Sequence, residues 1–143
     1  MGAPKAFPEK IVMEEARFSE LVADAVDALP QEFKDLLSNV EVVVADEPNA
    51  RQKQHLAEGS LLLGLYEGVP QTKRGARYNL ALPDKITIFQ KPTEQICRTD
   101  DGIVEQIGKT VRHEVAHHFG ISDERLQQLE QERQIGVKMP KIR

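Results

Sequence analysis

The sequence predicts an α+β domain in which a small, mainly antiparallel or mixed β-sheet packs against helices. Three observations lead to this fold class. Apolar residues recur at helical spacing toward both ends of the chain, three short apolar runs of strand length lie between them, and the 143 residues suffice for one compact core but not for two. The expected order is helix, strand, strand, strand, helix, helix.

The first helix is expected over residues 12–29, where apolar side chains fall on one side and most acidic side chains on the other. Pro30 ends this helix, and the sequence allows a short second helix over residues 31–38. The apolar side of the first helix comprises Phe18, Leu21, Val22, Ala25, Val26 and Leu29.

Strands are expected over residues 40–44, 61–66 and 85–90. The first is a run rich in β-branched valine, and glycine or proline bounds each of the other two. The long loop over residues 67–84 contains three basic residues. A loop of this length is often functional in a small domain, and flexible surface decoration is an equal alternative.

The last two helices are expected over residues 99–119 and 122–133. Thr99 offers a capping oxygen at the first start, Gly120 ends that helix, and Ser122 caps the second. The core face of the longer helix is predicted to comprise Ile103, Val104, Ile107, Val111, Val115 and Phe119.

Composition excludes several classes of protein. With 19 Lys+Arg against 23 Asp+Glu, the net charge of −4 provides no overall positive field for nucleic acid or anionic lipid. No apolar run approaches the roughly 20 residues of a membrane span. The single Cys97 excludes a disulfide framework and is interpreted as a small buried hydrophobe, so any metal must use His and carboxylates. We expect a cytoplasmic protein with a flexible leader over residues 1–10.

The chemistry-bearing motif is His113-Glu-x-x-His117 in the longer helix. Two residues four apart lie within about 40° of each other around a helix, so both imidazoles can reach one ion. Glu114 projects beside them, close enough to touch a water on that ion.

A third ligand is available beyond the helix end. Gly120 permits a sharp turn, and Asp123 follows three residues later, placed to swing back toward the two His. The full pattern, HExxHxxGxxD, specifies five positions in eleven. Chance matches should occur in well under about one chain in ten thousand.

This motif resembles that of the zincin metallopeptidases with Asp as third ligand, and its context resembles a small bacterial zincin-like family. The similar segments are residues 64–70 (GLYEGVP), 83–89 (PDKITIF) and 113–121 (HEVAHHFGI) with Asp123, and the likeness covers roughly residues 11–130. It implies a single zincin-like domain, assigned here to residues 11–135, followed by a basic C-terminal tail over residues 136–143.

The resemblance further implies a Zn²⁺ ion held by His113, His117 and Asp123, with Glu114 as the general base on metal-bound water. The expected function is a zinc-dependent peptidase whose substrate is a peptide or an extended protein segment, without nucleic-acid or membrane partners. In zincins the substrate backbone usually pairs with an exposed strand, and residues 61–66 are the candidate edge. The sequence leaves the oligomeric state open.

Some features depart from longer zincin patterns. Asp123 stands where metzincins have a third His, and Met139 is too close to the C-terminus to form a Met-turn. Tyr66 and Tyr78 are candidates for stabilising the oxyanion, but a packed ring is the favoured interpretation of each. His118 is expected near the core face as a hydrogen-bonded supporting residue, and His55 on the surface.

Two other functions use the same residues. A latent or non-catalytic metal-binding interaction module would keep the fold, although such a module has no need of a base beside its ligands. A DNA-binding helix-turn-helix around Gly120 is the second, but its recognition helix, residues 123–133, would carry a net charge of −2.

Overall fold

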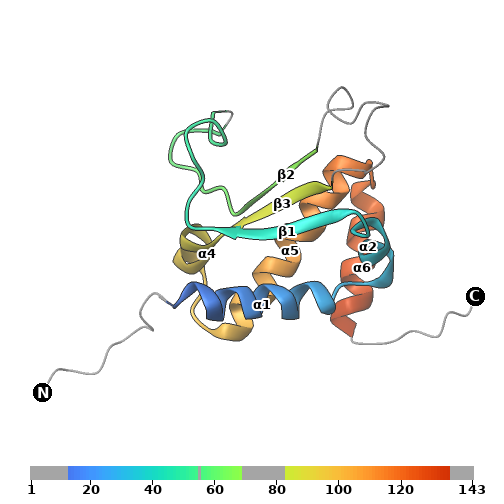
Figure 1. The fold of residues 1–143 in the computed structure, drawn as a ribbon. Helices are drawn as coiled ribbons and strands as arrows, with labels where there is room; N and C mark the ends of the chain where they lie inside the picture. Colours follow the sequence, from blue (N-terminus) through green and yellow to red (C-terminus); the bar gives the residue numbers. More distant parts are fainter. Residues whose placement is uncertain (1–12, 55, 69–82, 136–143) are drawn as a thin grey trace, which may run out of the picture.

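The computed structural model describes residues 13–54, 56–68 and 83–135, which form a mixed three-stranded sheet with five helices. Figure 1 shows the sheet lying across α1 and α5, with β3 as its central strand. The elements in chain order are α1 (Glu15–Asp27), α2 (Gln31–Leu36), β1 (Val40–Ala45), β2 (Gly64–Glu67), β3 (Asp84–Phe89), α4 (Gln90–Ile96), α5 (Asp100–Phe119) and α6 (Asp123–Ile135). The predicted α+β class with a small mixed sheet is confirmed.

The sheet combines both kinds of strand pairing. β1 runs parallel to β3, with Val40 opposite Asp84 and Ala45 opposite Phe89. β2 runs antiparallel to β3 on the other side, with Gly64 opposite Ile88 and Glu67 opposite Lys85. Among the strands of the described residues, β2 therefore lies at an edge of the sheet, as expected for the strand that was predicted to receive a peptide.

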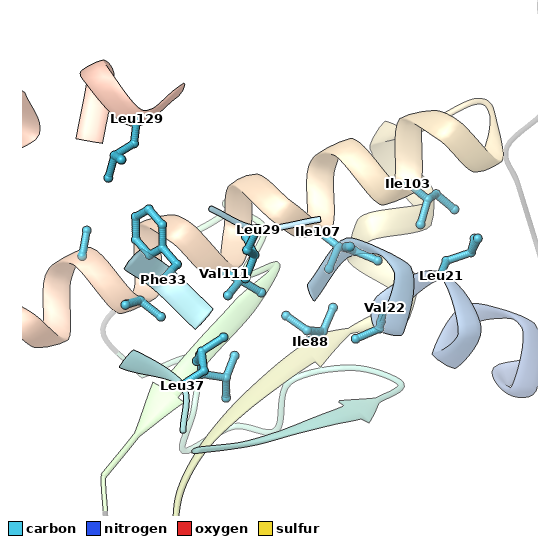
Figure 2. Close-up of a cluster of buried hydrophobic side chains, with 14 of the residues drawn as sticks. Leu21, Val22, Leu29, Phe33, Leu37, Ile88, Ile103, Ile107, Val111 and Leu129 are labelled. Carbon is cyan, nitrogen blue, oxygen red and sulfur yellow. The ribbon is translucent and has the colours of Figure 1, made fainter. Parts of the chain in front are cut away.

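The hydrophobic core lies between the sheet and the helices. Figure 2 shows side chains from α1, α2, β3, α5 and α6 converging on this layer. Most of the residues predicted for the core face of α5 are in the core. Four of them are completely buried: Ile103, Ile107, Val111 and Val115. Because these side chains are fixed, the rotation of α5 about its own axis is fixed too.

One helix was not predicted. α4 begins directly at Gln90, where β3 ends, and contains Pro92, which the sequence pattern favours as a strand terminator. Pro92 occupies the third position of α4, where a backbone N–H has no partner within the helix, so proline is tolerated there. The Thr93 hydroxyl also donates to the Phe89 carbonyl oxygen at 2.8 Å.

Other boundaries differ by a few residues. α1 begins at Glu15 rather than residue 12, and β2 covers Gly64–Glu67 rather than residues 61–66. The expected leader and basic tail, residues 1–10 and 136–143, lie outside the described residues, as does most of the long loop. Among the helices of the described part, none is long and apolar enough to cross a membrane.

Replacing Ile107 with alanine should destabilise the fold by about 2–5 kcal/mol, because Ile107 is fully buried and its truncation leaves a cavity in the hydrophobic core. The free energy of unfolding would be measured by urea titration. The exposed Lys109→Ala on the same helix is the control and should change it by less than about 0.5 kcal/mol. Equal effects of the two substitutions would contradict this account of the core.

Cys97 should react slowly with iodoacetamide at pH 8. Cys97 is 7% exposed, its Sγ lies 3.5 Å from the Gly102 carbonyl oxygen, and burial raises the pKa of the thiol above the ordinary value. A raised pKa leaves less thiolate at a given pH, so the alkylation rate should rise only at higher pH than for free cysteine. Unfolding in urea should restore the alkylation rate of an ordinary cysteine. An alkylation rate in the folded protein equal to that of free cysteine would contradict the burial of Cys97.

Candidate functional site

α5 is the element that carries the candidate residues, and its ends are as predicted. The Thr99 hydroxyl oxygen accepts a hydrogen bond from the Gly102 N–H at 2.9 Å, which caps the start. At the other end Gly120 has φ 72°, in the left-handed region, and its N–H donates to the Ala116 carbonyl oxygen. The twenty residues between these caps form one continuous helix.

His113 and His117 are both exposed on α5. Their spacing of four residues stacks them one turn apart, and the buried Val111 and Val115 direct the core face of the same helix elsewhere. The two imidazoles therefore belong to one solvent-facing side of α5, which is where a ligand pair open to a substrate has to lie.

Glu114 is half-buried and contacts the edge strand. One of its carboxylate oxygens, Oε1, accepts a hydrogen bond from the backbone N–H of Tyr66 in β2 at 2.9 Å. Strand geometry explains the contact: the Leu63 carbonyl oxygen faces β3, where it accepts from the Phe89 N–H, so the backbone of Tyr66, three residues on, faces the opposite way. The candidate base is thus joined to the backbone of the candidate substrate-binding strand.

The close approach of β2 to α5 depends on Gly64. A Cβ atom at this position would lie 2.6 Å from Cγ2 of Thr110 and 3.1 Å from the Thr87 carbonyl oxygen, so a larger residue would require the strand or the Thr110 side chain to shift. A glycine inside a strand is a recognised signal of such an approach. The sequence contains this signal at Gly64, within the segment GLYEGVP.

Tyr66 is packed, in agreement with the favoured interpretation, but its hydroxyl is not simply in water. It donates to Asp84 Oδ2 at 2.6 Å, while the ring stacks on His118 with centroids 3.9 Å apart and planes 18° apart. Phe119 meets both rings edge-on. The other candidate, Tyr78, lies outside the described residues, as does His55.

Two expectations for the last turn of α5 are wrong. Phe119 is 42% exposed rather than in the core, and the His118 side chain is 40% exposed rather than near the core face. The cause is the end of β2, which brings Tyr66 to this turn, so that both rings pack against the tyrosine at the surface. His118 Nε2 lies 3.9 Å from Asp84 Oδ2.

The turn after Gly120 leads directly into α6, which begins at Asp123. The Ser122 hydroxyl oxygen accepts from the Arg125 N–H at 3.0 Å, as predicted for the cap, and Leu126 and Leu129 are buried. The side chain of Asp123 lies outside the described part of the structure. Among the side chains that are described, no group of three His, Cys, Asp or Glu is placed to hold a metal ion.

The buried surface of α5 also holds a charged residue that sequence patterns did not indicate. Arg112 is 3% exposed, and its Nε lies 3.4 Å from Glu130 Oε2 on α6. The sequence alone favours a solvated face for Glu130. The pair joins α5 to α6 below the turn that carries Asp123, and only the folded hairpin brings the two residues together.

Comparison with known proteins gives a family and a fold. A family model described as zincin-like metallopeptidase matches residues 37–133, which run from the residue after α2 into α6 and include the whole HExxHxxGxxD segment. A conserved hypothetical protein from Thermus thermophilus is similar in structure, with a TM-score of 0.50 and 23% identity over 75% of this chain and 94% of that chain. No curated protein matches the sequence. Since the family model covers more than half of the chain, the protein belongs to the zincin-like metallopeptidase family.

Proposed function

We propose that the protein is a zinc-dependent peptidase in which His113, His117 and Asp123 hold the metal and Glu114 is the general base. The observation that carries the proposal is the arrangement on α5. The helix presents two exposed imidazoles one turn apart and, beside them, a carboxylate that is tied to an edge strand, in a chain of the zincin-like family.

The donor set suits zinc. Two imidazole nitrogens and one carboxylate oxygen are ordinary zinc ligands, and three protein ligands leave a fourth position for water or substrate, which is typical of catalytic sites. The exposure of both His side chains supports an open site. Zinc, when bound, would polarise the scissile carbonyl group and make a water molecule more acidic.

Glu114 would carry out the proton transfers of the reaction. Glu114 would accept a proton as water oxygen bonds to the carbonyl carbon, and it would deliver that proton to the amine nitrogen as the C–N bond breaks. The half-buried position of Glu114 and its hydrogen bond to the Tyr66 N–H restrict where its carboxylate can lie. A base needs this restriction because proton transfer requires hydrogen-bond distance to the reacting groups.

The edge position of β2 supports a peptide as substrate, because an extended chain can add to an exposed strand through main-chain hydrogen bonds. Gly64 is buried against Thr110, so α5 covers the start of β2. Farther along β2, the Tyr66 N–H already donates to Glu114, so an added peptide would have to pair with β2 through other main-chain groups.

Metal binding can be tested by elemental analysis after incubation with zinc and desalting. We expect one zinc per wild-type chain, none in His117→Ala, and a much weaker affinity in Asp123→Ala, because each change removes a ligand. Glu124→Gln alters the neighbouring carboxylate and should keep full occupancy. Absence of zinc from the wild type would make the site a relic or latent module, and full occupancy in Asp123→Ala would move the third ligand elsewhere.

Hydrolysis can be tested with a peptide library and the zinc-loaded protein. Glu114→Gln should keep the metal and the fold but lower kcat by about 10²-fold or more, because the amide is nearly isosteric with the carboxylate yet cannot accept the proton. Circular dichroism and zinc content provide the controls. Turnover at the wild-type rate in Glu114→Gln would exclude its role as base.

A further inference from the structure

We infer that Tyr66 is a positioning residue for Glu114, acting through its backbone N–H while its side chain holds the end of β2 in place. This inference rests on the proposed function for its catalytic consequence, but the contact itself can be tested without activity. Tyr66 thus has a role different from the oxyanion stabilisation considered for its hydroxyl.

A hydrogen bond joins the backbone of β2 to the side chain of Glu114 on α5. The hydrogen bond from the Tyr66 N–H to Glu114 Oε1, 2.9 Å long, joins residues 48 positions apart in the chain. A donor that belongs to a strand backbone has no side-chain rotamers, so the carboxylate meets a fixed partner. A Glu side chain has three rotatable bonds, and a fixed donor selects the conformers that keep one oxygen toward β2 and leave the other for the substrate side.

The side chain of Tyr66 holds this backbone donor in position. The Tyr66 ring is clamped between two different elements: its hydroxyl donates to Asp84 at the start of β3, and its face stacks on His118 in the last turn of α5. The Asp84 side chain is only 17% exposed, so its hydrogen bond is partly shielded from water. The clamp therefore ties the end of β2 both to the sheet and to the helix that carries Glu114.

The short length of β2 makes the side-chain contacts of Tyr66 important. The strand has four residues, so few main-chain hydrogen bonds to β3 secure it. Without the clamp, the Tyr66 N–H could move relative to α5, and displacement of a reacting group by about 1 Å can cost 10²-fold in rate. The packing of Tyr66 thus becomes a condition for a correctly placed base.

The contact can be tested by amide hydrogen exchange on the metal-free protein. The Tyr66 N–H should be protected in the wild type and exchange at least about tenfold faster in Glu114→Ala, because its acceptor is removed. The Leu65 N–H provides an internal reference, since Leu65 pairs with Thr87 in β3 and should keep its protection. Unchanged exchange at Tyr66 in Glu114→Ala would overturn the inference whether or not the protein hydrolyses peptides.

The consequence can be tested kinetically on the zinc-loaded protein. Tyr66→Ala removes the clamp and should lower kcat by about 10–100-fold with KM and zinc content nearly unchanged. Tyr66→Phe keeps the ring and should restore most of the rate, and it also serves if the alanine variant does not fold.

Arg51→Ala is the matched control, because Arg51 contacts the same strand but lies outside it. It breaks the 3.1 Å ion pair between Arg51 and Glu67 without touching the ring cluster, so kcat should stay at the wild-type value. A loss in Tyr66→Ala carried by KM alone, or an equal loss in Arg51→Ala, would overturn the positioning role. Absence of hydrolysis in the wild type would instead contradict the proposed function, and the exchange experiment would still decide the contact.

Discussion

The burial of one side of α5 against the sheet is the constraint on which the rest of the structure depends. Ile103, Ile107, Val111 and Val115 are completely buried, so the helix cannot rotate without exposing them. This burial directs His113 and His117 to solvent, and it turns Glu114 toward the edge strand. The same packing that stabilises the fold therefore orients the candidate ligands and the candidate base.

The second constraint is the contact between α5 and β2. Gly64 allows the strand to approach Thr110, and Tyr66 then meets Glu114 through its backbone and His118 through its ring. A sheet edge is often a liability because its backbone groups are unpaired. Here one of these backbone groups is paired, since the Tyr66 N–H donates to Glu114 on the helix that carries the zincin motif.

Local patterns predicted the parts of the fold and site that depend on neighbouring residues. The caps at Thr99 and Gly120 and the two His on one side of α5 follow from chemistry within a few positions. The family membership agrees with the motif, while the metal ligands and the base stay proposals. α4 was missed because a helix that starts where a strand ends leaves no turn signal, and Pro92 favoured a break instead.

Contacts between distant residues could not be predicted from the sequence. Tyr66 and Asp84 are 18 positions apart, and Tyr66 and Glu114 are 48 apart, so no local periodicity links them. Phe119 shows the same limit. The helical period assigned it to the core face, but the last turn of α5 meets the edge strand β2, and the ring finds its partners in Tyr66 and His118.

The four-residue length of β2 separates the stability of the site from the stability of the fold. Proteins open in cooperative units with different free energies, and a short edge strand belongs to a unit that costs less to open than the core. Detachment of β2 would remove the backbone partner of Glu114 while α1, α5 and their buried apolar side chains stay packed. Helix content measured by far-UV circular dichroism therefore reports on the scaffold, and it is blind to the open state in which the candidate base has lost its anchor.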